Sequence, residues 1–377
     1  FYRNETTGQN LSTQIMFASH HYSNDNTSFV PSTSTACLNS GHEGVASRSY
    51  SKNHQYILEW LTNYSACFAD KHNLKAMVGY SYQYSQSSGF NAENRDFPND
   101  GLGADNLGSG LWAKEEGEVL MGSYKNDSKL ISFFGRLSYD YDGKYLVTAS
   151  LRHEGSSKFG KNHKWGNFPA VSVGWRISQE EFMKDITWLD MLKLKGSWGT
   201  LGNQNLDKPY PAEPLLSNAY SAVFGTPSAI YPGYQLSYLP NPNLRWEKVE
   251  AWEVGAEANF FRNRLHFEGV YYKKTTKNLL AEVPGISGTV PGIGNLGSIE
   301  NKGVEIALNW RDQIGDWGYN IGGNLTTIKN KVLSLVQEGY SIIAGDKSQS
   351  YTMAGYPIGY FYGYKVEGIY QTQEEIN

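Results

Sequence analysis

The sequence predicts an all-β chain that forms a transmembrane, antiparallel, up-and-down β-barrel. Segments of alternating apolar and polar residues recur along the chain, which is the signature of strands. They come in pairs joined by tight links, such as Tyr141–Lys144 and Arg262–Asn263, and long polar loops separate the pairs. Short turns on one side and long loops on the other are typical of barrels in an outer membrane.

Composition is compatible with this class. The chain has 377 residues and a net charge of -4, with no basic block that would indicate nucleic-acid binding. No segment approaches the run of about 18 apolar residues that marks a spanning helix, and the mean hydropathy is -0.51. A spanning strand needs no such run, because every second residue faces a polar lumen.

Taken in order, the alternation yields about 12 candidate strands. Full charges such as Arg136, Arg152 and Glu253 stand in mid-strand, and burying them unpaired would be costly, so one face of the sheet must meet water. Almost no amphipathic helix is present to cover the opposite, apolar face, which favours lipid there. The clearest alternation runs over 74–84, 131–141, 144–152, 252–260, 303–311 and 319–325.

Aromatic residues gather beside the tight links. Barrels of this kind carry aromatic belts at both membrane interfaces, whereas the competing explanation is that aromatic residues favour strands anywhere. Clustering at four links of one class favours the belt. The residues are Phe68; Tyr139, Tyr141 and Tyr145; Phe260, Phe261 and Phe267; and Trp310, Trp317 and Tyr319.

One connection differs from the others. Ser178 followed by Glu181 forms a capping-box pattern, which predicts a short helix through Phe182 and Met183 on the short-turn side. Long loops are predicted on the other side because of their Pro, Gly, Ser and Asn content. Their approximate ranges are 24–52, 87–127, 202–244, 282–299 and 333–353.

The two ends and the two cysteines complete the outline. Cys37 and Cys67 lack the spacing of a zinc site or a disulfide framework, so we expect free thiols. The opening residues, Phe1 to Asn4, do not read as a signal peptide. We therefore expect the chain to be part of a longer or processed protein.

No catalytic, cofactor or metal motif stands out. His20 and His21 are adjacent on a predicted strand and so point to opposite faces, which argues against one shared ion. Glu253 and Glu257 share a face but lie about 13 Å apart along the strand, too far for a carboxylate pair acting on one bond. We expect no enzyme activity, no cofactor and no metal.

Aromatic residues in the long loops are the candidate ligand contacts. Their faces suit sugar rings or peptide side chains, and Tyr and Trp are favoured at binding hot spots. The alternative for each is packing of one loop against another. The candidates are Trp112, Tyr220, Phe224, Tyr231, Tyr234 and Tyr238.

Seven strings, in one order, resemble the SusC/RagA family of TonB-dependent outer-membrane transporters. They depart from the family in minor ways at Glu154 and Ala170. They are RLSYDYDGKYLVTASLRHEGSSKFG, WGNFPAVSVGWRISQEEFM, LKLKGSWGTLGNQ, NPNLRWE, FFRNRL, NKGVE and GYPIGYFYGYKVEGIYQT, spread from Arg136 to Thr372.

The resemblance implies a central-to-late slice of a barrel of about 22 strands. On that basis residues 1–377 are expected to form one partial barrel domain, without the family's plug domain and final strands. It also implies an outer-membrane importer of oligosaccharides or peptides. Its partners would be a SusD-like surface lipoprotein and, through the plug region, the TonB–ExbB–ExbD complex.

Two other functions remain open on the sequence alone. A passive porin, or a structural or adhesin barrel, would show the same strand pattern without a plug. A secreted all-β carbohydrate-binding module or enzyme would instead be soluble without detergent.

Overall fold

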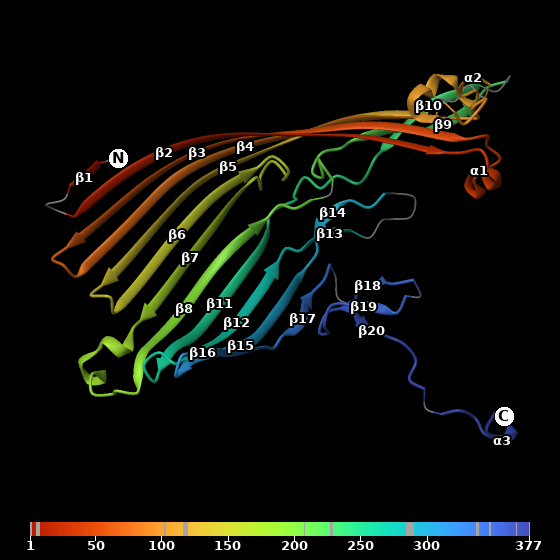
Figure 1. Ribbon diagram of the computed structural model, residues 1–377. Helices are drawn as coiled ribbons and strands as arrows, with labels where there is room; N and C mark the ends of the chain where they lie inside the picture. The colour runs from red at the N-terminus through yellow and green to blue at the C-terminus, as the bar shows by residue number, and fades with distance from the viewer. Residues whose placement is uncertain are drawn as a thin grey trace.

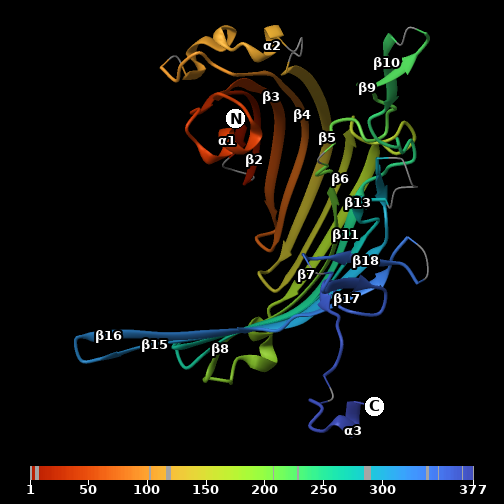
Figure 2. The same ribbon diagram turned by 90° about the vertical axis from the view of Figure 1, so that its right-hand side faces the viewer.

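The computed structural model describes residues 2–4, 8–101, 103–115, 120–206, 208–226, 229–283, 290–336, 339–346, 348–366 and 368–376. Its main feature is one curved, antiparallel sheet of 13 strands, which is open rather than closed into a barrel (Figures 1 and 2). Strands that follow one another in the sheet pair in sequence order, apart from the hairpins within the loops. The predicted all-β, up-and-down fold is confirmed.

The sheet strands are β1 (Tyr2–Asn4), β2 (Gln9–Val30), β3 (Val45–Phe68), β4 (His72–Arg95), β5 (Leu120–Tyr141), β6 (Tyr145–Ser156), β7 (Trp165–Trp175), β8 (Leu189–Asn203), β11 (Glu247–Phe260), β12 (Leu265–Lys277), β15 (Ser298–Ile314), β16 (Trp317–Thr326) and β17 (Lys329–Ser334).

Smaller elements lie in the connections. They are β9 (Leu216–Phe224) with β10 (Ala229–Leu236), β13 (Leu280–Glu282) with β14 (Ile293–Asn295), and β18 (Ser341–Ala344) with β19 (Ser350–Met353) and β20 (Tyr360–Phe361). The helices are α1 (Thr35–Ser40), α2 (Trp112–Glu115) and α3 (Gln373–Ile376), with the 3-10 helices η1 (Gly103–Ser109), η2 (Ile177–Gln179) and η3 (Glu181–Met183).

Two predicted loops are wrong in their extent. Strands β2 to β5 have 22 to 24 residues each, so strand structure covers much of 24–52 and 87–127. About 9–11 residues suffice to cross a bilayer, so these strands continue well beyond it. Their distal parts are rich in Ser and Asn and lack an apolar face, which is why the sequence pattern indicated loops. Pairing and polar contacts such as the 3.0 Å Arg48–Asp25 ion pair stabilise them instead.

The two faces of the sheet differ as predicted. On the apolar face, Val254, Val173 and Leu308 are 66%, 54% and 46% exposed although they lie within paired strands. On the polar face, Lys195 pairs with Glu268 across β8 and β12. Exposed apolar patches of this extent are rare on soluble monomers and mark contact with lipid or another apolar partner.

The short turns lie at one end of the sheet and the long connections at the other (Figure 1). Asp142 and Gly143, in the β5–β6 turn, have φ of 54° and 65°, the left-handed conformation that Asp-Gly hairpin turns adopt. Aromatic rings contact each other at this end of the sheet. The pairs include Tyr141–Tyr145 (6.3 Å between ring centroids), Trp188–Phe260 (5.9 Å) and Phe261–Trp310 (6.3 Å).

The β7–β8 connection lies on the short-turn side and has a short helix through Phe182 and Met183, as predicted, but the predicted Ser178 cap is wrong. The segment forms the 3-10 helices η2 and η3, and neither has a side-chain cap. Glu180 separates them because it is held by the neighbouring hairpin. The hydroxyl of Tyr145 donates to its carboxylate (2.7 Å), as does Nε1 of Trp175 (3.0 Å), and the Lys144 ammonium lies 3.6 Å away.

The long connections share a small hydrophobic cluster, which we call the loop core. Its residues include Phe159, Phe168, Leu206, Ala212, Leu244, Trp246 and Ile293. The string NPNLRWE supplies Leu244 and Trp246, and the Trp246 indole donates to the carbonyl of Lys164 (2.9 Å). Burial of these large side chains fixes the β6–β7, β8–β11 and β12–β15 connections relative to the sheet. No helix in the described part of the chain is long and apolar enough to cross a membrane.

A pair of identical substitutions distinguishes the two faces. Val254 lies midway along β11 on the apolar face, and Val270 lies one register step away on β12 on the polar face. In the full-length protein refolded in lipid vesicles, we expect Val254→Lys to lower the free energy of unfolding by about 2–4 kcal/mol, as for a lysine in lipid. Val270→Lys meets water and Glu305, its cross-strand neighbour, so its effect should be much smaller. Urea titration measures both values; equal losses would contradict the assignment of the faces.

A pH-dependent contact holds the β7–β8 connection. Hydrogen bonds from Tyr145 and Trp175, with the charge of Lys144, hold the pKa of Glu180 below its ordinary value of 4.5. A lowered carboxyl pKa stabilises the folded state above the ordinary pKa, and this contribution is lost as the pH falls through the lowered value. Glu180→Gln should therefore reduce hydrogen-exchange protection of 176–188 at pH 7 and make that protection insensitive to acid. Glu181→Gln, which breaks only the exposed pair with Lys184, is the control. An equal loss of protection in both variants would contradict this role of Glu180.

Candidate functional site

Two of the hollows on the polar face differ in charge. The first, of about 590 Å³, lies over β6, β7, β8, β11, β12 and β15 near the short-turn end. Lys195 pairs there with Glu268, Lys193 with Glu257 at 3.8 Å, and Ser197 with Glu253 at 3.5 Å. Glu257 and Glu268 are cross-strand neighbours, and the two lysines offset their repulsion. Glu253 and Glu305 also line this hollow, and neither has a lysine or arginine within 4.0 Å among the described residues. The region is therefore a lattice of ion pairs with an excess of negative charge.

The second hollow, of about 680 Å³, lies where β2 to β5 meet the loops of the long-connection end. We call it the mouth pocket. Most of its polar-face side chains are neutral hydrogen-bonding groups. They are His20, Tyr22, Asn53, Gln55, Ser85, Ser87, Asn126 and Ser128, with Lys158, Leu206 and Pro209 from the loops.

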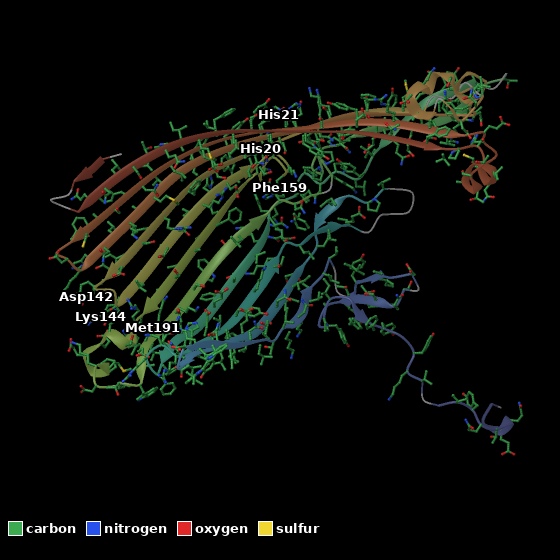
Figure 3. The ribbon with its side chains drawn as sticks, viewed as in Figure 1. His20, His21, Asp142, Lys144, Phe159 and Met191 are labelled. Carbon is green, nitrogen blue, oxygen red and sulfur yellow. The ribbon has the colours of Figure 1, made fainter. Side chains whose placement is uncertain are left out.

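The two adjacent histidines lie on opposite faces of β2, as predicted, because successive strand residues alternate (Figure 3). His20 lies on the face that carries the mouth pocket. The ring of His21 instead contacts that of His54, its partner on β3, and the Ser19 hydroxyl lies 2.7 Å from its Nε2. Within the described residues, no three His, Cys, Asp or Glu side chains gather as metal ligands would.

The predicted ligand-contact residues fall into three places. Trp112, on α2, lies at the tip of the extended β2–β5 region, where the Arg95 guanidinium stacks 4.8 Å from its ring and His42 packs against its edge. Its ring therefore already has two partners. As a ligand contact it remains a prediction.

Three further candidates lie on the β9–β10 hairpin, which stands away from the sheet (Figure 2). Phe224, Tyr231 and Tyr234 are 63%, 54% and 71% exposed, and the rings of Phe224 and Tyr231 lie 6.0 Å apart. The backbone of Tyr220 pairs with Gly233 in this hairpin, but its side chain lies outside the described part.

Tyr238 is buried instead, with 7% of its surface exposed. Its hydroxyl donates to the carbonyl of Tyr210 (2.9 Å), and the Lys208 ammonium lies 5.1 Å from its ring. Burial raises the pKa of the Tyr238 hydroxyl. The structure thus brings together the hairpin residues but neither Trp112 nor Tyr238 with them, and contact of any of the six with ligand stays a prediction.

Sequence reasoning missed the mouth pocket because part of it lies on segments read as loops and most of the rest on strand segments with two polar faces. Residues 18–24 and 51–57 do alternate, but between two polar sets, so hydropathy carries no signal there. Cross-strand matching of Asn, Gln and Ser between 51–57 and 83–89 is the signal that could have located it. In both hollows the groups present bind by hydrogen bonds and charge.

Comparison with known proteins agrees with this architecture. Residues 1–366 match the family described as TonB dependent receptor-like, beta-barrel. TonB-dependent receptor P3 of Formosa agariphila is 34% identical over 364 residues, which cover 93% of this chain and 35% of that protein. TonB-dependent receptor SusC of Bacteroides thetaiotaomicron is 33% identical over 235 residues, covering 60% of this chain and 23% of that protein.

Solved structures show the same fold. The structure of the RagAB peptide transporter superposes with a TM-score of 0.80 at 24% identity, covering 92% of this chain and 37% of that one. A second structure, of the RagAB peptide importer in a closed-closed state, gives 0.79.

The chain thus spans about a third of the length of the relatives that it matches over most of its own length. The seven strings, the sheet with its two unlike faces and these matches agree, and the chain belongs to the TonB-dependent receptor β-barrel family.

Proposed function

We propose that this chain forms a wall of an outer-membrane, TonB-dependent importer of oligosaccharides or peptides. The observation that carries the proposal is the sheet itself. One face exposes Val254, Val173 and Leu308 as lipid would require, and the other carries two polar hollows. A face of this kind suits passage of a polar cargo, and the residues described offer hydrogen bonds and ion pairs rather than a catalytic constellation.

The two hollows suit different tasks. At the short-turn end, the ion-pair lattice carries an excess of negative charge, which fits a protein surface with basic side chains packed against it. A plug region within the same protein, outside this chain, is the proposed occupant, and it would link the barrel to TonB–ExbB–ExbD. At the long-connection end, the mouth pocket offers uncompensated hydrogen-bonding groups, which fit a cargo.

The β9–β10 hairpin is the proposed contact for a SusD-like surface lipoprotein. A two-stranded hairpin is marginal in water on its own. This one also exposes Ile230 (74%), Tyr234 (71%) and Leu216 (67%), an apolar surface at the long-connection end (Figure 2). A lid seated there would cover these side chains and close over the mouth pocket.

Energy dependence tests the importer. Cells that express the full-length protein should take up labelled cargo from the native growth substrate, and an uncoupler that dissipates the proton-motive force should abolish this uptake. A passive porin would continue to equilibrate cargo after the uncoupler is added. Uptake that persists at its original rate would therefore contradict the proposal and favour a porin.

The hairpin is tested by lid binding. The double variant Ile230→Ser with Tyr234→Ser removes two exposed apolar side chains without touching the loop core. We expect its affinity for the proposed SusD-like lipoprotein partner to fall about tenfold or more, since buried aromatic anchors carry much of the energy of an interface. Leu38→Ser on α1, where Leu38 is 67% exposed, is the matched control. Unchanged affinity, measured by co-purification and titration, would exclude the hairpin as the lid contact.

A further inference from the structure

Lys158 occupies a fixed place at the rim of the mouth pocket. It lies two residues after the end of β6 and precedes Phe159, which is 1% exposed in the loop core. The amide of Lys158 donates to the Ser156 hydroxyl (3.2 Å), and the amide of Gly160 donates to the carbonyl of Leu244 (3.0 Å). These contacts fix the backbone on both sides of Lys158, so its side chain starts from a preorganised position (Figure 3 labels Phe159).

Among the described residues, the ammonium of Lys158 has no acidic partner, whereas other partly buried lysines do. Lys144, Lys193 and Lys208, whose side chains are 19%, 31% and 19% exposed, each have a carboxylate within 4.0 Å. Lys158 is half-buried, and no carboxylate of the described residues lies within that distance. Burial lowers the pKa of the Lys158 ammonium.

Among the described residues, the surrounding pocket points no carboxylate at Lys158 either. Its polar-face side chains from β3 and β4 are the amides Asn53 and Gln55 and the hydroxyls Ser85 and Ser87. Asp127 is among the lining residues, but it alternates onto the opposite face of β5, and its carboxylate accepts a hydrogen bond from the Tyr210 hydroxyl (3.1 Å). A cation with neutral neighbours in a hollow of about 680 Å³ is a site for an anionic group on a ligand that is otherwise neutral and polar.

We propose that the mouth pocket binds an acidic oligosaccharide, whose carboxylate or sulfate group pairs with Lys158 while amides and hydroxyls of β3 and β4 bind the sugar hydroxyls. The proposal rests on the importer function proposed above and specifies its cargo.

The pocket fits a sugar better than a peptide. Extended peptides are commonly bound by adding to a free strand edge, whereas β3 and β4 are paired along both edges where they line the pocket. Tyr22, 62% exposed on the polar-face side of β2, offers an aromatic face of the kind that packs on sugar rings.

The charge on Lys158 makes binding of an acidic oligosaccharide depend on pH. An anion beside the ammonium raises the pKa that burial has lowered, so binding is accompanied by proton uptake near that pKa. Affinity for an acidic cargo should therefore weaken as the pH rises through the lowered pKa of free Lys158. Lys158→Arg keeps its charge throughout this range and should remove the pH dependence while retaining binding.

The test uses the full-length receptor in detergent and an oligosaccharide array in which every uronic-acid or sulfated member has a neutral counterpart of the same length. We expect preferential binding of acidic members; carboxylated and sulfated arms identify the anion. By titration calorimetry, Lys158→Gln should lower the affinity for the best acidic member about tenfold or more, as for loss of one charge-assisted hydrogen bond. The affinity for its neutral counterpart should be unchanged. Lys161→Gln, an exposed lysine three residues on, is the matched control and should change neither value.

Several results would overturn the proposal. They are equal binding of acidic and neutral members, binding of peptides alone, no binding across the array, or a Lys158→Gln variant that matches Lys161→Gln. Each leaves the importer function standing if uptake still collapses with the uncoupler. Uptake that ignores the uncoupler would contradict the importer itself, whichever members of the array bind.

Discussion

The structure depends on the need of every backbone amide and carbonyl to find a partner where water is absent. Antiparallel pairing satisfies these groups between neighbouring strands and leaves only side chains to meet the surroundings. Because side chains alternate, the same strand presents Val254 to one environment and Glu253 to the other. A shift of register by one residue would exchange the two sets, so the alternation also fixes the pairing of neighbouring strands.

The hollows follow from this two-sided design. Across β8, β11 and β12, long charged side chains form ion pairs, and the Lys195–Glu268 pair spans a whole strand. Where β3 and β4 extend past the bilayer, both faces are wet and short amides and hydroxyls suffice to line a pocket. The loop core completes the mouth pocket, because Phe159, Leu244 and Trp246 hold the long connections in place over it. Lys158 is positioned by the same packing.

The sequence predicted the strands best where lipid imposes a hydropathy pattern. The alternation over 252–260 corresponds to β11, and Asp142 and Gly143 form the predicted turn with left-handed backbone conformations. Both features could be predicted because each has a strong local signal in the sequence. Extension of β2 and β3 to Val30 and Val45 could not be predicted in this way, since a strand with two wet faces has no hydropathy signal. The capping box at Ser178 misled because contacts from Tyr145 and Trp175, distant or adjacent in sequence, hold Glu180 in an extended conformation. Within the candidate site, the sequence identified the aromatic residues of the long loops. It could not show that Lys158 has no acidic partner among the described residues, because that depends on which residues lie near it in the folded chain.

Accessibility scanning along β11 tests the central claim most directly. Cys37 and Cys67 are first replaced, and single spin labels are then placed at each position from Trp252 to Asn259 in the full-length protein in lipid vesicles. Collision with oxygen, which concentrates in lipid, should be greatest at the positions of Trp252, Val254 and Ala256. Collision with a water-soluble nickel complex should be greatest at those of Glu253, Gly255 and Glu257. Loss of this two-residue period, or equal exposure of both sets to the nickel complex, would contradict a sheet that separates lipid from a wet interior.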